Sequence, residues 1–181
     1  MCKTQECKTN DEVEMNLRVL MSISAFVTFG VTTVFANPVN ISWSDPSEYR
    51  DLRSTIETKE KLQHRFFKEI NAHMNDLSQQ LPAGYKLSLD VYQVDLAGRI
   101  ETVHSQRIRV VKDMYYPNMA FNFKLVDKSG QLVLTDKAKI KGRNFLLNTS
   151  MRSINESFKY EKKMLSDWFE KDLLTRVIDK E

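Results

Sequence analysis

Cysteine is scarce in this chain of 181 residues: the sequence has two, Cys2 and Cys7, and both lie within its first ten residues. From residue 8 onward there is no thiol that could form a disulfide, hold a metal ion or act as a nucleophile. Glycine (5) and proline (4) are also few, which excludes a collagen and a low-complexity linker protein. With 41% hydrophobic and 28% charged residues, the composition is typical of a folded globular protein and not of a disordered chain.

The sequence also lacks the common motifs of catalysis. It contains no Gly-x-Ser-x-Gly, no phosphate-binding P-loop and no dinucleotide-binding glycine pattern. His64 and His73 are nine residues apart, so on one helix they point in opposite directions and cannot share a metal ion, and His104 stands alone. We therefore expect no cofactor and no metal, and a non-enzymatic role is favoured over an enzymatic one.

No charged residue occurs between Val19 and Ser44, and the first part of this stretch, residues 19–36, is mostly apolar. Arg18 precedes it, and small residues near Ala36 occupy the two positions that a signal peptidase reads. This arrangement predicts a signal peptide over residues 1–36, cleaved before Asn37, and a periplasmic location. The alternative is an uncleaved membrane anchor, but the run is diluted by Ser and Thr and is short beside the ~20 strongly apolar residues of a spanning helix.

Residues 1–14 differ from the start of a typical signal peptide, because they carry four acidic and two basic side chains. An acidic N-terminal region opposes the usual inside-positive orientation. We interpret Met15 as the initiator and residues 1–14 as a gene-model extension. Residues 37–181 are then expected to form a single α+β domain with 24 basic and 20 acidic side chains, and its net charge of +4 is too small for a nucleic-acid binder.

A first helical pattern covers residues 54–81. Apolar side chains recur there at helical spacing, and Ser54 and Glu57 form the capping-box pattern that often begins a helix. Pro82 and Gly84 end the pattern. We expect a long amphipathic helix with one exposed face, which needs a sheet to cover its apolar side.

A second helical pattern covers residues 153–178. Ser153 and Glu156 form another capping-box candidate at its start. The apolar residues spread over a wide arc, which predicts burial on more than one side of the helix. At ~100° per residue, Glu161 and Asp172 point toward the middle of this arc.

Alternation of apolar and polar residues predicts strands over residues 39–43, 87–96 and 107–114. In the second of these, the apolar positions change parity in the middle of the strand. Such a change is typical of a β-bulge, which we place between Val91 and Gln93.

The clearest strand pattern is a hairpin formed by residues 119–125 and 132–140 around an Asp-Lys-Ser-Gly turn. With a two-residue loop, Leu125 pairs with Leu132 and Phe123 pairs with Leu134. The order of elements is strand, helix, three or more antiparallel strands, helix. It predicts the α+β class, with an antiparallel sheet of about four strands and two long helices packed on one face.

The best candidate for a polar site is a cluster of Asp95, Arg99, Arg107, Arg109 and Glu161. One interpretation is a binding site for an anion or a polar ligand, with Arg107 and Arg109 as bidentate donors. The other is an internal structural ion pair, because a buried Glu161 must be paired. We favour the structural interpretation, since charge networks of this kind are often structural.

Four segments carry a combined pattern beyond secondary structure: Ile41–Pro46 with Tyr49 and Asp51, Val94–Arg99, Arg107–Val111 with Pro117, and Tyr160–Phe169. Together they resemble an exported Gram-negative family, domain-of-unknown-function family 3016. The resemblance covers nearly all of residues 39–174, and its last segment is the most specific. It implies one domain, a signal peptide and an envelope location, and it supplies no catalytic residue, cofactor or substrate.

From these observations we expect a non-enzymatic periplasmic binding or envelope accessory domain, acting through a groove between the sheet and the C-terminal helix. Its partner is expected to be an unknown envelope component or a small anionic ligand, with no nucleic acid and no stable membrane span after signal cleavage. Two alternatives stay open. One is a small envelope hydrolase using Asp90, Asp95 or Glu161, and the other is a domain tethered by an uncleaved N-terminal helix.

Overall fold

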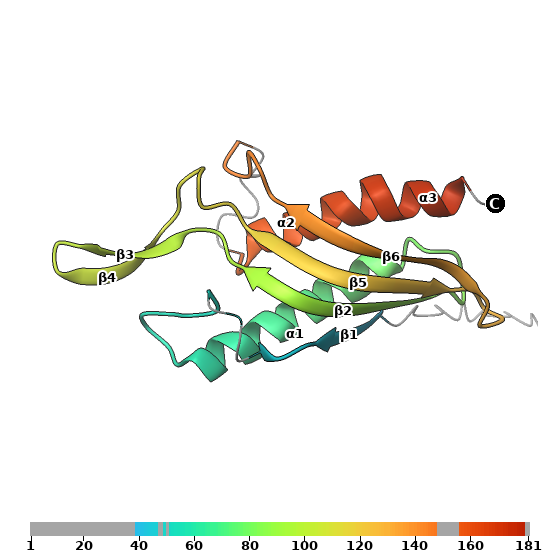
Figure 1. Ribbon diagram of the computed structural model, residues 1–181, viewed down its shortest axis with the longest axis horizontal. Coiled ribbons are helices and arrows are strands. Elements are labelled where there is room, and N and C mark those ends of the chain that lie inside the picture. The colour runs from blue at the N-terminus through green and yellow to red at the C-terminus, as the bar shows by residue number, and fades with distance from the viewer. Residues whose placement is uncertain (1–38, 47–48, 50, 148–155, 180–181) are drawn as a thin grey trace, which may run out of the picture. The chain divides into compact units, whose positions relative to one another are not determined.

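The computed structural model describes residues 39–46, 49, 51–147 and 156–179, which belong to one compact unit, residues 35–181. The elements are β1 (Val39–Trp43), α1 (Lys59–Ser78), β2 (Lys86–Asp95), β3 (Arg99–Val103), β4 (Gln106–Val110), β5 (Asn118–Val126), β6 (Leu132–Lys141), α2 (Lys159–Trp168), η3 (Phe169–Leu173) and α3 (Leu174–Ile178). They form a four-stranded sheet in the order β1-β2-β5-β6 and a separate two-stranded sheet, β3-β4, with helices packed alongside (Figure 1). The architecture is α+β, as the sequence predicts.

The four-stranded sheet is mixed, so the prediction of an antiparallel sheet is wrong for one pair of strands. β1 runs parallel to β2, with Val39 beside Leu87 and Trp43 beside Val91, whereas β2-β5 and β5-β6 are antiparallel. The reason lies in the order of elements, because α1 separates β1 from β2. A helix between two neighbouring strands returns the chain to the end where the first strand began, and the second strand then runs in the same direction.

The β-bulge predicted in β2 is confirmed. The pairing of β2 with β5 shifts between Val91, which lies opposite Phe121, and Gln93, which lies opposite Ala120. Tyr92 is therefore the extra residue of the bulge. The shift keeps Val91 and Val94 buried although they differ in parity.

The register predicted for the hairpin of β5 and β6 is wrong by two residues. Leu125 lies opposite Leu134, not Leu132. A shift in the pairing between Leu125 and Val126 then places Leu132 opposite Val126, where it is half exposed. The turn is longer than the predicted two-residue loop. Asp127 Oδ1 stabilises this longer turn by accepting hydrogen bonds from the backbone N–H groups of Ser129 and Gln131. Apart from Leu132, a slip of two residues preserves which side chains face the core, so the apolar pattern alone could not detect it.

Both helices begin later than their capping patterns suggest. Ser54 Oγ accepts hydrogen bonds from the N–H groups of Ile56 and Glu57, but this is an isolated turn, and the side chain of Thr58 caps α1 instead. The second capping-box candidate begins at Ser153, which lies outside the described residues. The described helix α2 begins at Lys159.

The C-terminal helix contains a π-helical turn, η3, between α2 and α3. This turn inserts an extra residue and so rotates everything that follows it relative to a uniform α-helix. Asp172 lies within this turn, where the ~100° per residue of a uniform α-helix does not hold, and the prediction for it is wrong: its side chain is half exposed and lies 3.7 Å from Arg176, whereas Leu173 is fully buried. Glu161 precedes the π turn, and it is buried as predicted.

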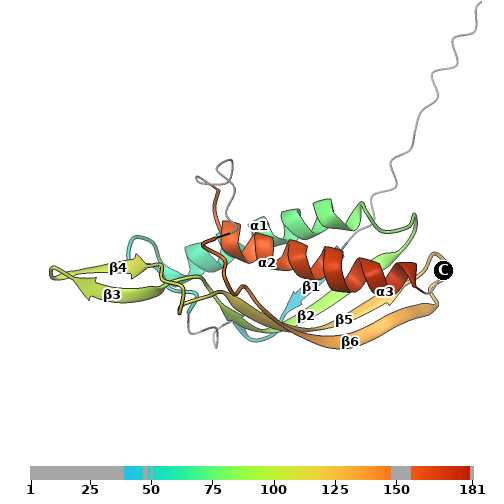
Figure 2. The same cartoon turned by 90° about the horizontal axis from the view of Figure 1, so that it is seen from above.

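Aromatic side chains join the helices to the sheet. Trp43 of β1 stacks on Phe67 of α1 with ring centroids 4.3 Å apart. Trp168 of α2 packs edge-on against Phe121 and Phe123 of β5, at 4.8 and 5.3 Å. Figure 2 shows α1 and the α2–α3 segment lying alongside the strands of the larger sheet. In the part of the chain that the structure describes, no helix is both long and apolar enough to cross a membrane.

Candidate functional site

The site is built around three residues, Leu96, Ala97 and Gly98, where the chain leaves β2 and enters the β3-β4 hairpin. All three are buried although they belong to no strand. Gly98 has a φ of +81°, and a Cβ atom there would lie 2.8 Å from the carbonyl oxygen of Val110. Glycine is needed at this position for both reasons, since other residues avoid this backbone region and the neighbouring strand leaves no room for a side chain.

Glu161 holds this segment from the first turn of α2. Its carboxylate accepts a hydrogen bond of 2.7 Å from the backbone N–H of Ala97, and only 3% of the residue is exposed. Burial raises the pKa of the Glu161 carboxyl, while the N–H of Ala97 and the charge of Arg109 partly offset this effect.

Asp51 holds the neighbouring residue in the same way. Its Oδ2 accepts a hydrogen bond of 2.8 Å from the backbone N–H of Leu96. Burial also raises the pKa of the Asp51 carboxyl, although Arg109 and the N–H of Leu96 act in the opposite direction. Two consecutive N–H groups are therefore bound by carboxylates from distant parts of the chain.

Arg109 of β4 completes the arrangement. Its Nη1 donates to Asp51 Oδ2 at 3.2 Å and to the carbonyl oxygens of Ala97 and Gly98 at 3.4 and 2.9 Å. Its Nη2 donates to the carbonyl oxygens of Asp51 and Arg53 at 2.9 and 3.0 Å. We call Leu96, Ala97 and Gly98 the junction, and we call Asp51, Arg109 and Glu161 the junction clamp. Together these three side chains bind both N–H and C=O groups of the junction.

Of the five residues predicted to form a polar cluster, the structure brings Arg109 and Glu161 together, because both bind the main chain of Ala97. Asp95 lies at the end of β2, where its carboxylate accepts a hydrogen bond of 3.3 Å from Gln93 Nε2. Arg99 and Arg107 are exposed on the β3-β4 hairpin.

Asp51 belongs to the clamp and is missing from the predicted cluster. It precedes the first helix in a segment without periodicity, where residue spacing says nothing about spatial neighbours. One feature of the sequence could have indicated it. Asp51 belongs to the first of the four segments that resemble the family, and two of the other segments contribute Arg109 and Glu161 to the clamp.

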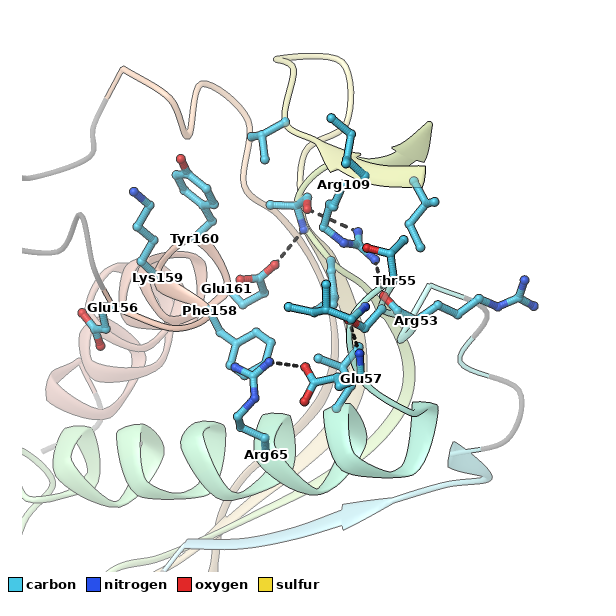
Figure 3. A pocket seen from close by; sticks show the side chains of 18 residues that line it. Arg53, Thr55, Glu57, Arg65, Arg109, Glu156, Phe158, Lys159, Tyr160 and Glu161 are labelled. Atoms are coloured by element: carbon cyan, nitrogen blue, oxygen red, sulfur yellow. Dashed lines mark hydrogen bonds and ion pairs between the residues drawn. The ribbon is translucent and has the colours of Figure 1, made fainter. Parts of the chain in front are cut away.

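A pocket of about 400 Å³ lies directly beside the clamp (Figure 3). Glu161 contributes from α2, and its carboxyl group points from the helix toward the side of the pocket that holds Arg109. The other walls come from the segment before α1, from the β3-β4 hairpin and from the start of α2. Its apolar lining residues are Ile56, Leu62, Leu96, Ala97, Ile100, Ile108, Val111, Phe158 and Tyr160.

Three of the aliphatic side chains at this pocket are unusually exposed. Ile56 is 93% exposed, Ile108 42% and Val111 39%. They come from two separate segments and meet at one concave site. Exposed aliphatic side chains gathered around a concavity are typical of a surface that binds something.

One side of the pocket is fixed by Arg65. Its guanidinium forms an ion pair with Glu57 and lies over the ring of Phe158, 4.9 Å from the ring centroid. Arg53, another lining residue, points away from the pocket (Figure 3). Glu57 and Arg65 are thus engaged with each other, and Arg53 is turned outward, so these three charged groups leave the interior mainly apolar.

The carboxylates considered for hydrolysis do not converge. Asp90 lies on the outward-facing side of β2, where it accepts hydrogen bonds from Ser44 Oγ at 2.7 Å and from Asn122 Nδ2 at 3.1 Å. Its neighbours in the strand, Leu89 and Val91, are buried on the opposite side. Within the described ranges, no three His, Cys, Asp or Glu side chains are grouped closely enough to hold a metal ion.

Comparison with known proteins assigns a family and no activity. Neither a curated protein nor a solved structure matches the chain. The model of one family, described as a protein of unknown function (DUF3016), matches residues 37–171. This match includes every residue of the junction clamp and of the pocket beside it, and it covers most of the sequence, so the chain belongs to the DUF3016 family.

Proposed function

We propose that this protein is an exported, non-enzymatic binding or accessory domain of the cell envelope, and that it binds its ligand in the pocket beside Glu161. The observation that carries the proposal is the gathering of Ile56, Ile108 and Val111 around this pocket, with the carboxyl group of Glu161 in its wall. Leaving these aliphatic groups in water costs free energy that a bound apolar ligand would recover.

The lining indicates the chemistry of the ligand. Half of the lining residues are aliphatic or aromatic, and apolar atoms make up most of the surface of the wall, which suits an apolar body of the size that a 400 Å³ pocket can hold. Glu161 is an acceptor, so a ligand with one N–H or O–H donor fits it best. Both terminal nitrogens of Arg109 already donate to acceptors in the protein, which makes an anionic group a poorer match than a neutral donor.

We also propose that the two long helices form one layer over a single face of the larger sheet. Trp43, Val91 and Phe121 are register partners across β1, β2 and β5, so their side chains share a face. Trp43 contacts α1 and Phe121 contacts Trp168 of α2. In this proposed arrangement, the pocket lies at the end of the helical layer, where α2 begins and the β3-β4 hairpin leaves the sheet.

Export is the second part of the proposal. The uncharged apolar run of residues 19–36 and the small residues before Asn37 support a cleaved signal peptide. In this interpretation the domain is residues 37–181, and its ligand is a component of the periplasm or of the envelope.

Binding can be tested with N-phenyl-1-naphthylamine, an apolar fluorescent amine that carries one N–H donor. We expect a saturable rise in its fluorescence with the unmodified protein. Ile108→Ser removes an aliphatic wall and should weaken binding about tenfold, which corresponds to about 1.4 kcal/mol. Leu132→Ser is the matched control, because Leu132 is also an exposed strand residue, 50% accessible, but does not line this pocket.

Glu161→Gln adds a test of the acceptor. The amide keeps the size of the side chain and an oxygen for Ala97, but it is a weaker acceptor for the amine, so affinity should fall several-fold. Equal affinity in the Ile108 and Leu132 variants, or no saturable signal with the unmodified protein, would contradict the proposed site.

A further inference from the structure

A second surface of the protein carries five exposed lysines. Successive side chains of a strand point to opposite faces of the sheet. Leu134 and Ala138 of β6 are buried, so the odd-numbered residues that follow Leu134 in this strand point to the other face. The same reasoning applies to the neighbouring strands β5 and β2. The outward lysines are Lys86 of β2, Lys124 of β5, and Lys137, Lys139 and Lys141 of β6, and all five are exposed. We call this surface the lysine face.

The charges of the lysine face are not neutralised by partners within the described residues. Lysines elsewhere in the fold form ion pairs, as Lys112 does with Glu101 and Lys162 with Glu69. By contrast, the register partners of the β6 lysines on β5 are the uncharged residues Asn122, Ala120 and Asn118. Asp90 and Asp95 are the carboxylates on this side of β2, which leaves a net positive charge concentrated on β5 and β6.

Protection of an exposed strand edge explains only part of this pattern. β6 is an edge strand, and lysines on an edge discourage pairing with another chain. Lys124 and Lys86 lie on β5 and β2, which are interior strands of the sheet. Lysines on interior strands do nothing to protect an edge, so the face as a whole needs another explanation.

The chemistry of the surface indicates what it would meet. Alternate residues along a strand are ~7 Å apart, so the lysines form a broad and shallow array. Lysine is a flexible point charge without the fixed geometry that arginine uses to grip a single phosphate, and it suits a diffuse anionic surface. Tyr92, the extra residue of the bulge, adds a 38% exposed aromatic ring to β2, and tyrosine is favoured where a protein meets a membrane interface.

We propose that the lysine face binds the surface of a membrane that contains anionic lipids. The helices and the pocket beside Glu161 would then point away from the lipid. In Figure 1 the strands of the larger sheet lie in front of the helices, so the lysine face is turned toward the viewer. This inference does not depend on the ligand of the pocket, and the two can fail separately.

The test is co-sedimentation of the full chain with vesicles of equal parts phosphatidylglycerol and phosphatidylcholine, and with vesicles of phosphatidylcholine alone. Binding to the neutral vesicles measures any contribution of the apolar N-terminal run, which is the same in every variant. We expect stronger binding to the anionic vesicles, and we expect that excess to disappear between about 0.1 M and about 1 M salt.

The variant Lys137→Gln with Lys139→Gln should bind anionic vesicles roughly 25-fold more weakly, since each lysine near an anionic surface contributes about fivefold. The matched control is Lys61→Gln with Lys68→Gln, which removes the same charge from exposed positions of α1 and should change binding far less.

Three results would overturn the proposal. Equal losses in the two double variants would mean that net charge alone matters. Self-association of the Lys137/Lys139 variant with unchanged vesicle binding would leave edge protection as the role of these lysines. Binding of duplex DNA with the same dependence on Lys137 and Lys139, but no binding to anionic vesicles, would assign the face to nucleic acid.

Discussion

Glu161 and Ala97 are 64 residues apart in the sequence, yet the carboxylate of one accepts a 2.7 Å hydrogen bond from the backbone N–H of the other. The adjacent N–H, that of Leu96, is bound by Asp51, and the carbonyl groups of the same segment are bound by Arg109. The β3-β4 hairpin is thus attached to the rest of the fold by charged side chains and not by a continuous strand ladder. Since the same hairpin forms a wall of the pocket, the clamp and the binding site depend on each other.

The stability of the protein should depend on pH through Glu161. Its pKa is raised in the folded state above the 4.5 of an ordinary glutamate, so its contribution to the free energy of unfolding is fully present below about pH 4.5 and is lost as the pH rises through the folded value. Glutamine does not titrate. The free energy of unfolding of the unmodified protein, minus that of Glu161→Gln, should therefore fall as the pH rises from about 4.5.

Urea denaturation over a pH series measures this difference directly. Glu170→Gln serves as a control, because it removes an exposed carboxyl from the same helical run. If the free energy of unfolding of the unmodified protein, minus that of Glu161→Gln, rises with pH, the prediction is contradicted. The charge of Arg109 would then affect the pKa of Glu161 more than burial does and would hold Glu161 ionised.

Arg109 should be far more sensitive to substitution than its neighbour Arg107. Lysine keeps the charge but cannot reach the Asp51 carboxylate, the carbonyl groups of residues 96–98 and the carbonyl groups of the segment before α1 at once. We expect Arg109→Lys to cost roughly 2 kcal/mol in urea denaturation, and Arg107→Lys, on the same strand but exposed, to stay within about 0.5 kcal/mol. Losses of similar size in both variants would show that the hydrogen bonds of Arg109 contribute little.

Gly98 offers a comparison with Gly130. Both have positive φ, +81° and +84°, so alanine carries a backbone penalty of about 1 kcal/mol at either position. At Gly98 the new Cβ would also lie 2.8 Å from the Val110 oxygen, whereas nothing lies within 4 Å at Gly130. Gly98→Ala should therefore lower the melting temperature clearly more than Gly130→Ala, and equal shifts would mean that the hairpin moves without cost.

Much of the fold could be predicted from local patterns. The bulge between Val91 and Gln93 followed from a change in apolar parity, and the class followed from the order of elements. The errors arose where the pattern does not distinguish alternatives. Apart from Leu132, a two-residue slip in the β5-β6 hairpin leaves the same side chains buried, and the π turn that contains Asp172 breaks the assumption of ~100° per residue.

The site was harder to predict, because its contacts join segments that have no shared periodicity. Burial of Glu161 could be expected from its place on the helix, and a nearby arginine from the need to pair a buried charge. β3 was not predicted as a strand, because its turn at His104 and Ser105 uses left-handed residues without glycine or asparagine. Without that hairpin, the pocket could not be anticipated.

Export makes a prediction that depends only on the N-terminal segment. If residues 1–36 are a cleaved signal peptide, protein recovered from the periplasmic fraction of the cells that produce it should begin at Asn37. N-terminal sequencing or intact mass measurement gives the answer. An intact N-terminus at Met1 or Met15 would contradict cleavage and favour an uncleaved anchor.

The most direct test of the binding pocket uses isoleucine methyl groups as reporters. Of the seven isoleucines that the structure describes, Ile56, Ile100 and Ile108 line the pocket, whereas Ile41, Ile70, Ile140 and Ile178 do not. In a ¹³C-methyl NMR titration with N-phenyl-1-naphthylamine, we expect saturable shifts of the first three signals and little change in the other four. Shifts spread evenly over all seven, or confined to isoleucines outside the pocket, would contradict the account.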